Sequence, residues 1–188
     1  EEDFRTLCAE AKKRGIHVML DGVFNHTGRK SVYFNADGFY PGLGAAQGKQ
    51  SPYYRWYNFH PFPDEYDAWW GIKNLPAVNE LEKSYVDYII EGNNSIIKRW
   101  LRAGASGWRL DVADELPDEF IAKIRAAMNE ENPDTYLLGE VWEDGTTKIA
   151  YSQRRKYLLG RETNGLMNYP FRTALMAFLL GGGAEYFR

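Results

Sequence analysis

Short apolar segments rich in β-forming residues alternate along this chain with amphipathic helical segments, and this alternation constrains the fold more than any other feature. The predicted strands are residues 16–24, 108–112, 135–140 and 166–169. The predicted helices are residues 1–14, 84–101 with a break at 92–94, 117–132, 148–159 and 171–180. Such alternation favours parallel strands joined by right-handed crossovers. We therefore predict an α/β fold, with the largely apolar first strand buried on both faces.

The length limits how much of such a fold is present. The chain has 188 residues, whereas a complete eight-stranded α/β barrel typically needs about 250. An open doubly wound sheet is the alternative, but Gly181-Gly182-Gly183 ends a predicted helix and does not open one, as a phosphate-binding loop would. The chain also begins at Glu1 inside a predicted helix, so we expect an internal piece of a longer protein. The predicted fold class is a partial TIM (β/α)8 barrel.

Residues 27–80 lack a sustained period of either kind and are rich in aromatic side chains. Nine of the eighteen positions from Tyr53 to Trp70 are aromatic. Because a structureless loop of this length is rare in a compact domain, we predict a small inserted subdomain after the first strand. The predicted organisation is residues 1–26 as the first part of the barrel, 27–80 as the insert and 81–188 as the second part. We expect most of the aromatic rings to form the subdomain core.

Composition excludes several classes of protein. A formal net charge of −3 gives no electrostatic reason to bind nucleic acid or an anionic membrane surface. The single cysteine, Cys8, excludes an internal disulfide and a cysteine-built metal site. No apolar run approaches the roughly 20 residues that a membrane span requires.

Three acidic residues occupy equivalent positions late in predicted strands: Asp21, Asp111 and Glu140. Active sites of parallel barrels lie at the carboxyl ends of the strands, so carboxylates placed there converge on one cavity. Arg109 and Asp111 are two residues apart on one strand and point to the same face. The Arg109 guanidinium then favours the ionised form of Asp111, which a nucleophile requires.

Glu140 follows an apolar strand, and we expect it to act as a proton donor. A carboxyl group in a poorly solvated pocket near other anions has a raised pKa, which suits that role. Each of these residues also has a structural interpretation, as a helix cap or an ion pair, and His26 by itself is more typical of a hydrogen-bonded structural histidine. Three carboxylates on successive strands, with Asn25-His26 directly after the first, favour a catalytic site.

Several segments resemble the α-amylase family of glycoside hydrolases. Residues 21–26 (DGVFNH), 107–115 (GWRLDVADE) and 139–142 (GEVW) resemble three signature regions of that family in the correct order. Residues 75–80 (LPAVNE) resemble the inserted-domain signature of the neopullulanase and cyclomaltodextrinase branch, and 165–172 (GLMNYPFR) resemble another stretch of that branch. The resemblance covers essentially the whole chain and implies about strands 3 to 6 of the barrel with their helices.

The resemblance implies a retaining hydrolase of α-glucosidic bonds in maltooligosaccharides, cyclodextrins, pullulan or starch-type α-glucans. It implies that Asp111 is the nucleophile, that Glu140 is the general acid/base, and that Arg109 positions Asp111. Retention requires two carboxyl groups about 5–5.5 Å apart across the scissile bond. The aromatic insert suits such a substrate, because the apolar faces of sugar rings stack on aromatic rings.

The resemblance also implies the substrate contacts. Asp21 and His26 bind the sugar at the cleaved bond, and Glu115 and Trp142 lie where the branch contacts the sugar beyond it. Asn25 matches a position that helps to hold a structural calcium in many family members, but this branch often lacks that ion, so we assign no metal. No redox or organic cofactor is implied.

Features that the chain lacks set further expectations. The family's third catalytic carboxylate, in an Asn/Ser-His-Asp motif, is not in this sequence. We therefore expect the isolated chain to have little or no hydrolase activity, and its exposed sheet edges to promote homo-oligomers or aggregation. The branch implies a cytoplasmic location. Two alternatives stay open: an oligo-1,6-glucosidase-type branch, against which residues 75–80 argue, and a non-catalytic carbohydrate-binding or interaction module.

Overall fold

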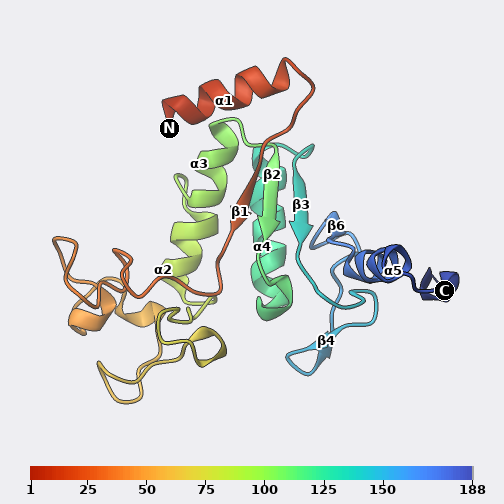
Figure 1. Cartoon of the computed structure of the whole chain (residues 1–188). Coiled ribbons are helices and arrows are strands. Elements are labelled where there is room, and N and C mark those ends of the chain that lie inside the picture. Colours follow the sequence, from red (N-terminus) through yellow and green to blue (C-terminus); the bar gives the residue numbers. More distant parts are fainter. Residues whose placement is uncertain (188) are drawn as a thin grey trace. The chain divides into compact units, whose positions relative to one another are not determined.

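The structure is a computed structural model that describes residues 1–187, with side chains up to residue 185 (Figure 1). It divides into two compact units, residues 1–21 with 101–188, and residues 22–100. The first unit contains the helices α1 (Glu2–Lys12), α4 (Asp118–Glu131) and α5 (Tyr169–Leu179), and the short helical turns η5 (Ala113–Glu115) and η6 (Ala184–Phe187). The strands are β1 (Met19–Gly22), β2 (Gly107–Leu110), β3 (Tyr136–Gly139), β4 (Ile149–Ala150), β5 (Gln153–Arg154) and β6 (Gly165–Leu166).

A four-stranded sheet in the order β1-β2-β3-β6 organises the first unit. β2 pairs with β3 in parallel, and β3 pairs with β6 in parallel. These pairings confirm the predicted α/β fold with a parallel sheet. The expectation that the first strand is buried on both faces is wrong, because β1 is an edge strand and the side chains of Ile16 and Met19 are exposed.

Helix α4 supplies the core beneath this sheet. Its predicted span, 117–132, agrees with the observed helix, and Figure 1 shows it running behind β2 and β3. Phe120, Ile124 and Met128 recur on one face of the helix and are fully buried, as are Leu110 and Leu137 of the strands. Burial of these apolar side chains fixes the strands against the helix.

The predicted helix at 148–159 is wrong, because this segment forms the antiparallel hairpin β4–β5. Tyr151 and Ser152 at its tip both have positive φ, as a two-residue type I′ turn requires. Arg155, which a helix would place on the outside, is only 4% exposed and donates to the carbonyl oxygens of Asp114 and Leu116. These hydrogen bonds to a distant segment hold the hairpin in place.

The second unit, residues 22–100, contains the whole of the predicted insert and the segment that follows it. Its helical elements are α2 (Lys83–Val86), the π-helical turn η4 (Asp87–Glu91) and the 3-10 turns η1 (Ala45–Gln47), η2 (Tyr54–Trp56) and η3 (Trp69–Gly71), while α3 (Ile96–Arg102) crosses into the first unit. Phe34, Trp56 and Tyr57 are buried and form an aromatic core, whereas Trp70 is exposed. The three-part division at residues 26 and 80 stays a prediction.

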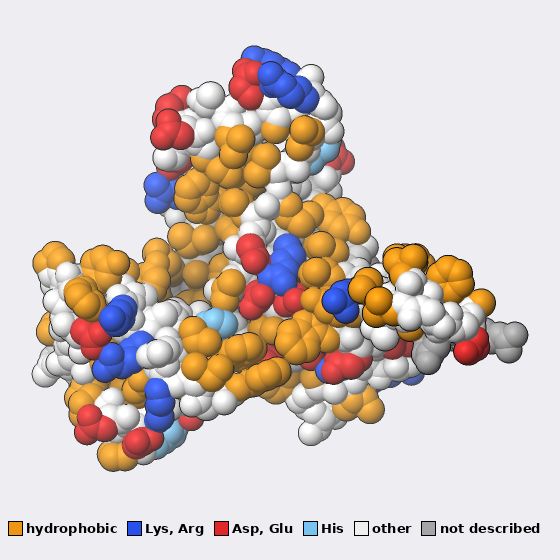
Figure 2. All heavy atoms as spheres, viewed as in Figure 1, with side chains coloured by type: hydrophobic (Ala, Val, Ile, Leu, Met, Phe, Trp, Pro, Cys, Tyr) orange, Lys and Arg blue, Asp and Glu red, His pale blue; other side chains and the backbone are white. Residues whose placement is uncertain are grey.

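Helix α5 presents apolar side chains to solvent in the described part of the molecule. Phe171, Met176, Phe178 and Leu179 are all exposed, and Figure 2 shows hydrophobic side chains gathered over this helix. Among the helices of residues 1–187, none is both long enough and apolar enough to cross a membrane.

Candidate active site

The register of the parallel strands places two acidic residues next to one another. Leu110 of β2 is paired with Gly139 of β3, and Asp111 and Glu140 are the residues that directly follow these partners. The Glu140 backbone is held on both sides, since its N–H donates to the Leu110 carbonyl at 2.9 Å and its carbonyl accepts the Ala113 N–H at 2.9 Å. Strand pairing therefore fixes the separation of the two side chains.

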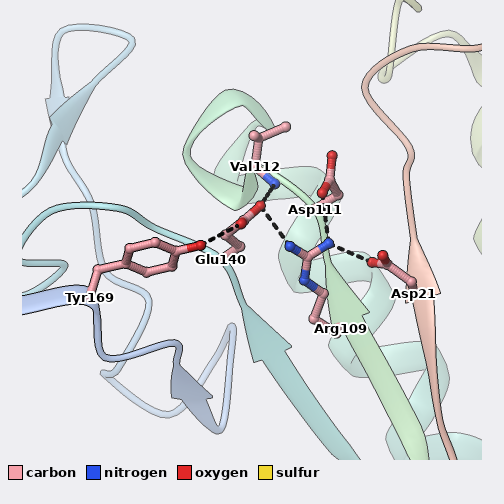
Figure 3. A network of polar contacts seen from close by, with 6 residues as sticks. All are labelled: Asp21, Arg109, Asp111, Val112, Glu140 and Tyr169. Atoms are coloured by element: carbon pink, nitrogen blue, oxygen red, sulfur yellow. Dashed lines mark hydrogen bonds and ion pairs between the residues drawn. The ribbon is translucent and has the colours of Figure 1, made fainter. Parts of the chain in front are cut away.

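Arg109 joins three carboxylates from three strands (Figure 3). Its Nη1 lies 2.7 Å from Asp21 Oδ1 and 2.6 Å from Asp111 Oδ1, and its Nη2 lies 2.8 Å from Glu140 Oε2. Burial alone would lower the pKa of Arg109, but hydrogen bonds with Asp21 and Asp111 outweigh it and raise the pKa. The guanidinium stays charged and holds the three carboxylates close to one another, because all three contact this one group.

The backbone at Val112 is strained where it meets this network. Val112 has φ 39° and ψ 56°, a left-handed conformation that a β-branched residue rarely adopts. Its side chain is buried, and its N–H donates to Glu140 Oε2 at 3.0 Å. In this conformation the Val112 N–H points toward Glu140, and no sequence signal indicates this backbone geometry.

The expected raised pKa of Glu140 is wrong. Burial does raise it, but hydrogen bonds from the Val112 N–H, Trp142 and Tyr169, together with the charge of Arg109, outweigh burial and lower the pKa. Glu140 is 6% exposed, and hydrogen-bond donors of the protein take the place of water around its carboxylate. The sequence revealed the apolar strand but not the donors that other segments bring to its end.

Tyr169 is a residue of this network that the sequence analysis did not single out. Its hydroxyl donates to Glu140 Oε1 at 3.0 Å, and its ring centroid lies 6.3 Å from that of Trp142. Trp142 is half-exposed beside the carboxylate. Tyr169 falls within residues 165–172, so the resemblance of that stretch to the family was the available signal.

The other predicted site residues have different surroundings. Glu115 lies in η5, where its backbone carbonyl accepts the Tyr151 hydroxyl at 2.6 Å. His26 belongs to the second unit and stacks on Trp69, with ring centroids 5.3 Å apart. The substrate-binding roles of both residues stay predictions.

Asn25, also in the second unit, is buried, and its amide oxygen and nitrogen have no hydrogen-bond partner among the described residues. Within residues 1–187, no group of three or more His, Cys, Asp or Glu side chains could hold a metal ion. A single amide is a poor fit for calcium, which takes six to eight oxygen ligands. We assign no metal site.

The parallel sheet and the arginine-bridged carboxylates at its strand ends define an α/β-barrel segment that carries an acidic site. The family model for the alpha amylase catalytic domain matches residues 1–184, and the chain belongs to the α-amylase family. This match confirms the predicted family and barrel fold.

Known relatives agree with the predicted branch. The chain is 38% identical over 198 residues to an amylopullulanase of Thermoanaerobacterium saccharolyticum, and the match covers 96% of this chain. It is 30% identical over 187 residues to neopullulanase 2 of Thermoactinomyces vulgaris, covering 95% of this chain. The solved debranching enzyme of Nostoc punctiforme superposes with a TM-score of 0.75 at 33% identity, covering 93% of this chain.

These matches involve a minor part of each relative. The chain spans 15% of the amylopullulanase, 28% of the neopullulanase and 34% of the debranching enzyme.

Proposed function

We propose that this chain supplies the nucleophile and the general acid/base of a retaining α-glucoside hydrolase. Asp111 is the nucleophile and Glu140 is the acid/base. The observation that carries the proposal is the single Arg109 guanidinium bound to Asp21, Asp111 and Glu140 at 2.6–2.8 Å. A shared guanidinium keeps two carboxyl groups close enough to act on one glycosidic bond.

The two carboxyl groups have different surroundings, which suit different roles. Asp111 is 25% exposed in its side chain and is paired with Arg109, so its carboxyl group is both oriented and accessible for attack on the anomeric carbon. Glu140 is 8% exposed in its side chain, and a bound sugar would exclude the remaining water. Further burial raises the pKa of a carboxyl group, and so favours the protonated form that the first step needs.

We propose an α-glucan as the substrate, with α-1,4 or α-1,6 bonds. The relatives are named for pullulan-type substrates, which supports this class. The exposed indole of Trp142 beside Glu140 offers an apolar surface to the sugar beyond the cleaved bond. Asp21, His26 and Glu115 complete the proposed contacts.

Azide rescue tests the two roles separately in the complete product of the gene that encodes this sequence. Each displacement at the anomeric carbon inverts its configuration. With α-maltosyl fluoride and azide, Asp111→Gly should give the β-glycosyl azide by direct attack. Glu140→Ala should give the α-glycosyl azide, because azide attacks the β-linked glycosyl-enzyme. The reverse pattern would exchange the roles.

Maltotriose binding provides a check on the alternative, a non-catalytic carbohydrate-binding module. Binding by the wild-type protein without turnover of maltotriose, pullulan or cyclodextrin would contradict the hydrolase. We also propose self-association of the isolated chain through apolar surfaces such as that of α5, which light scattering measures. A monomer at high concentration would contradict that association.

A further inference from the structure

The two carboxylate oxygens of Glu140 have different partners. Oε2 accepts the Val112 N–H at 3.0 Å and lies 2.8 Å from Arg109 Nη2. Oε1 accepts the Tyr169 hydroxyl at 3.0 Å. Figure 3 shows Tyr169 approaching Glu140 from the side opposite Arg109.

Backbone contacts place Tyr169 with respect to Glu140. Leu166 of β6 is paired with Gly139, the residue before Glu140, and the Met167 N–H donates to the Gly139 carbonyl at 2.9 Å. Two residues later α5 begins at Tyr169, with the Asn168 side chain capping the helix by accepting the Phe171 N–H at 3.0 Å. The phenol is therefore anchored to the strand that carries Glu140.

The chemistry of these partners distinguishes the two oxygens. A backbone N–H and a guanidinium can only donate, so Oε2 is held as an acceptor. A phenol both donates and accepts, and it can donate to one lone pair of Oε1 while Oε1 carries a proton toward a substrate. Trp142 also donates to Glu140, but of the two carboxylate oxygens only Oε1 has a partner, the phenol, that can accept as well as donate, so Oε1 is the oxygen better suited to carry a proton.

We propose that Tyr169 is a positioning residue for Glu140, whose hydroxyl fixes Oε1 as the oxygen that exchanges a proton with the substrate. This inference rests on the proposed function. In the first step the Oε1–H bond breaks and its proton passes to the leaving glycosidic oxygen, while an Asp111 oxygen bonds to the anomeric carbon. In the second step Oε1 takes a proton from water, whose oxygen bonds to that carbon and displaces Asp111. Tyr169 keeps its own proton throughout.

The charged groups near Glu140 and Tyr169 come from three elements. Arg109 lies in β2 and Asp111 directly follows it, Asp21 lies in β1, and Arg172 lies one turn after Tyr169 in α5. The Tyr169 hydrogen bond is one of the contacts that lower the pKa of Glu140, and its loss should raise that pKa.

The test compares Tyr169→Phe with the wild type in the complete gene product, using two substrates. On maltotriose, whose sugar leaving group needs a proton, kcat/KM should fall roughly tenfold. On α-maltosyl fluoride, whose leaving group needs little proton transfer, kcat/KM should stay within twofold. The alkaline limb of the kcat/KM profile should move to higher pH, because that limb reports the pKa of the acid.

Tyr136→Phe is the matched control. It also removes a tyrosine hydroxyl, at the start of β3, the strand that Glu140 directly follows, and it should leave both activities unchanged. An equal fall on both substrates would overturn the inference and assign Tyr169 a purely structural role. Unchanged kinetics on both substrates in an active enzyme would also overturn it, while leaving the proposed function intact. A wild-type protein that turns over neither substrate would overturn the proposed function itself.

Discussion

A buried carboxyl group in the first unit should make stability fall as pH rises. Glu162 is 5% exposed, and its Oε2 has no hydrogen-bond partner among the described residues. Burial raises its pKa from 4.5 to about 7, and the charge of Asp118 adds to this, while Arg155 and Lys156 oppose it. The folded chain therefore holds a proton that the unfolded chain releases.

The sign and size follow from proton linkage. Between pH 4.5 and about 7 the folded state binds more protons than the unfolded state, so its free energy of unfolding declines across this interval. Each pKa unit corresponds to about 1.36 kcal/mol, which sets an upper limit of about 3 kcal/mol. Screening by solvent reduces this, and we expect about 1–3 kcal/mol at pH 8.

Glu162→Gln removes the titration while keeping the shape of the side chain. Urea unfolding should show the variant more stable than the wild type by about 1–3 kcal/mol at pH 8 and equal to it near pH 4.5. Glu130→Gln, which changes an exposed carboxylate of α4, is the matched control and should leave the free energy of unfolding unchanged at both pH values. A constant difference between Glu162→Gln and the wild type at all pH values would refute the reasoning.

Two further predictions concern the sheet and its site. Arg109→Lys should lower kcat/KM of the complete gene product by about 10–100-fold, because one ammonium cannot bind Asp111 and Glu140 through separate nitrogens. Steady-state kinetics measure this change, and a kcat/KM within twofold of the wild-type value would contradict the prediction. Gly107→Ala should destabilise the chain by about 1–3 kcal/mol, because a Cβ there would meet the Tyr136 carbonyl oxygen at 2.0 Å and force β2 away from β3; an unchanged urea midpoint would contradict this.

The sequence predicted most elements of the first unit because their signals are local. The apolar period of residues 117–132 gave α4 to within one residue at each end, and the apolar run at 135–140 located β3. The hairpin at 149–154 was missed for the opposite reason. Its conformation depends on Arg155 reaching carbonyl groups some forty residues earlier in the chain, and no local pattern encodes that contact.

The candidate site, too, was predictable from the sequence only in part. Residue types and their places at strand ends were enough to select Asp21, Arg109, Asp111 and Glu140, because parallel strands bring their carboxyl ends together. The ionisation of Glu140 was not predictable, since it depends on donors from Val112 and two other segments. Their distances are set by register and helix placement.

By itself, the sequence determined the family, the α/β architecture and which acidic side chains lie at the strand ends of one site. These follow from periodicity, strand ends and motif order. Tertiary structure alone decided the strained Val112 backbone, the distinct partners of the two Glu140 oxygens and the burial of Glu162. Electrostatic energies depend on distances between atoms remote in sequence, and only the folded chain fixes those distances.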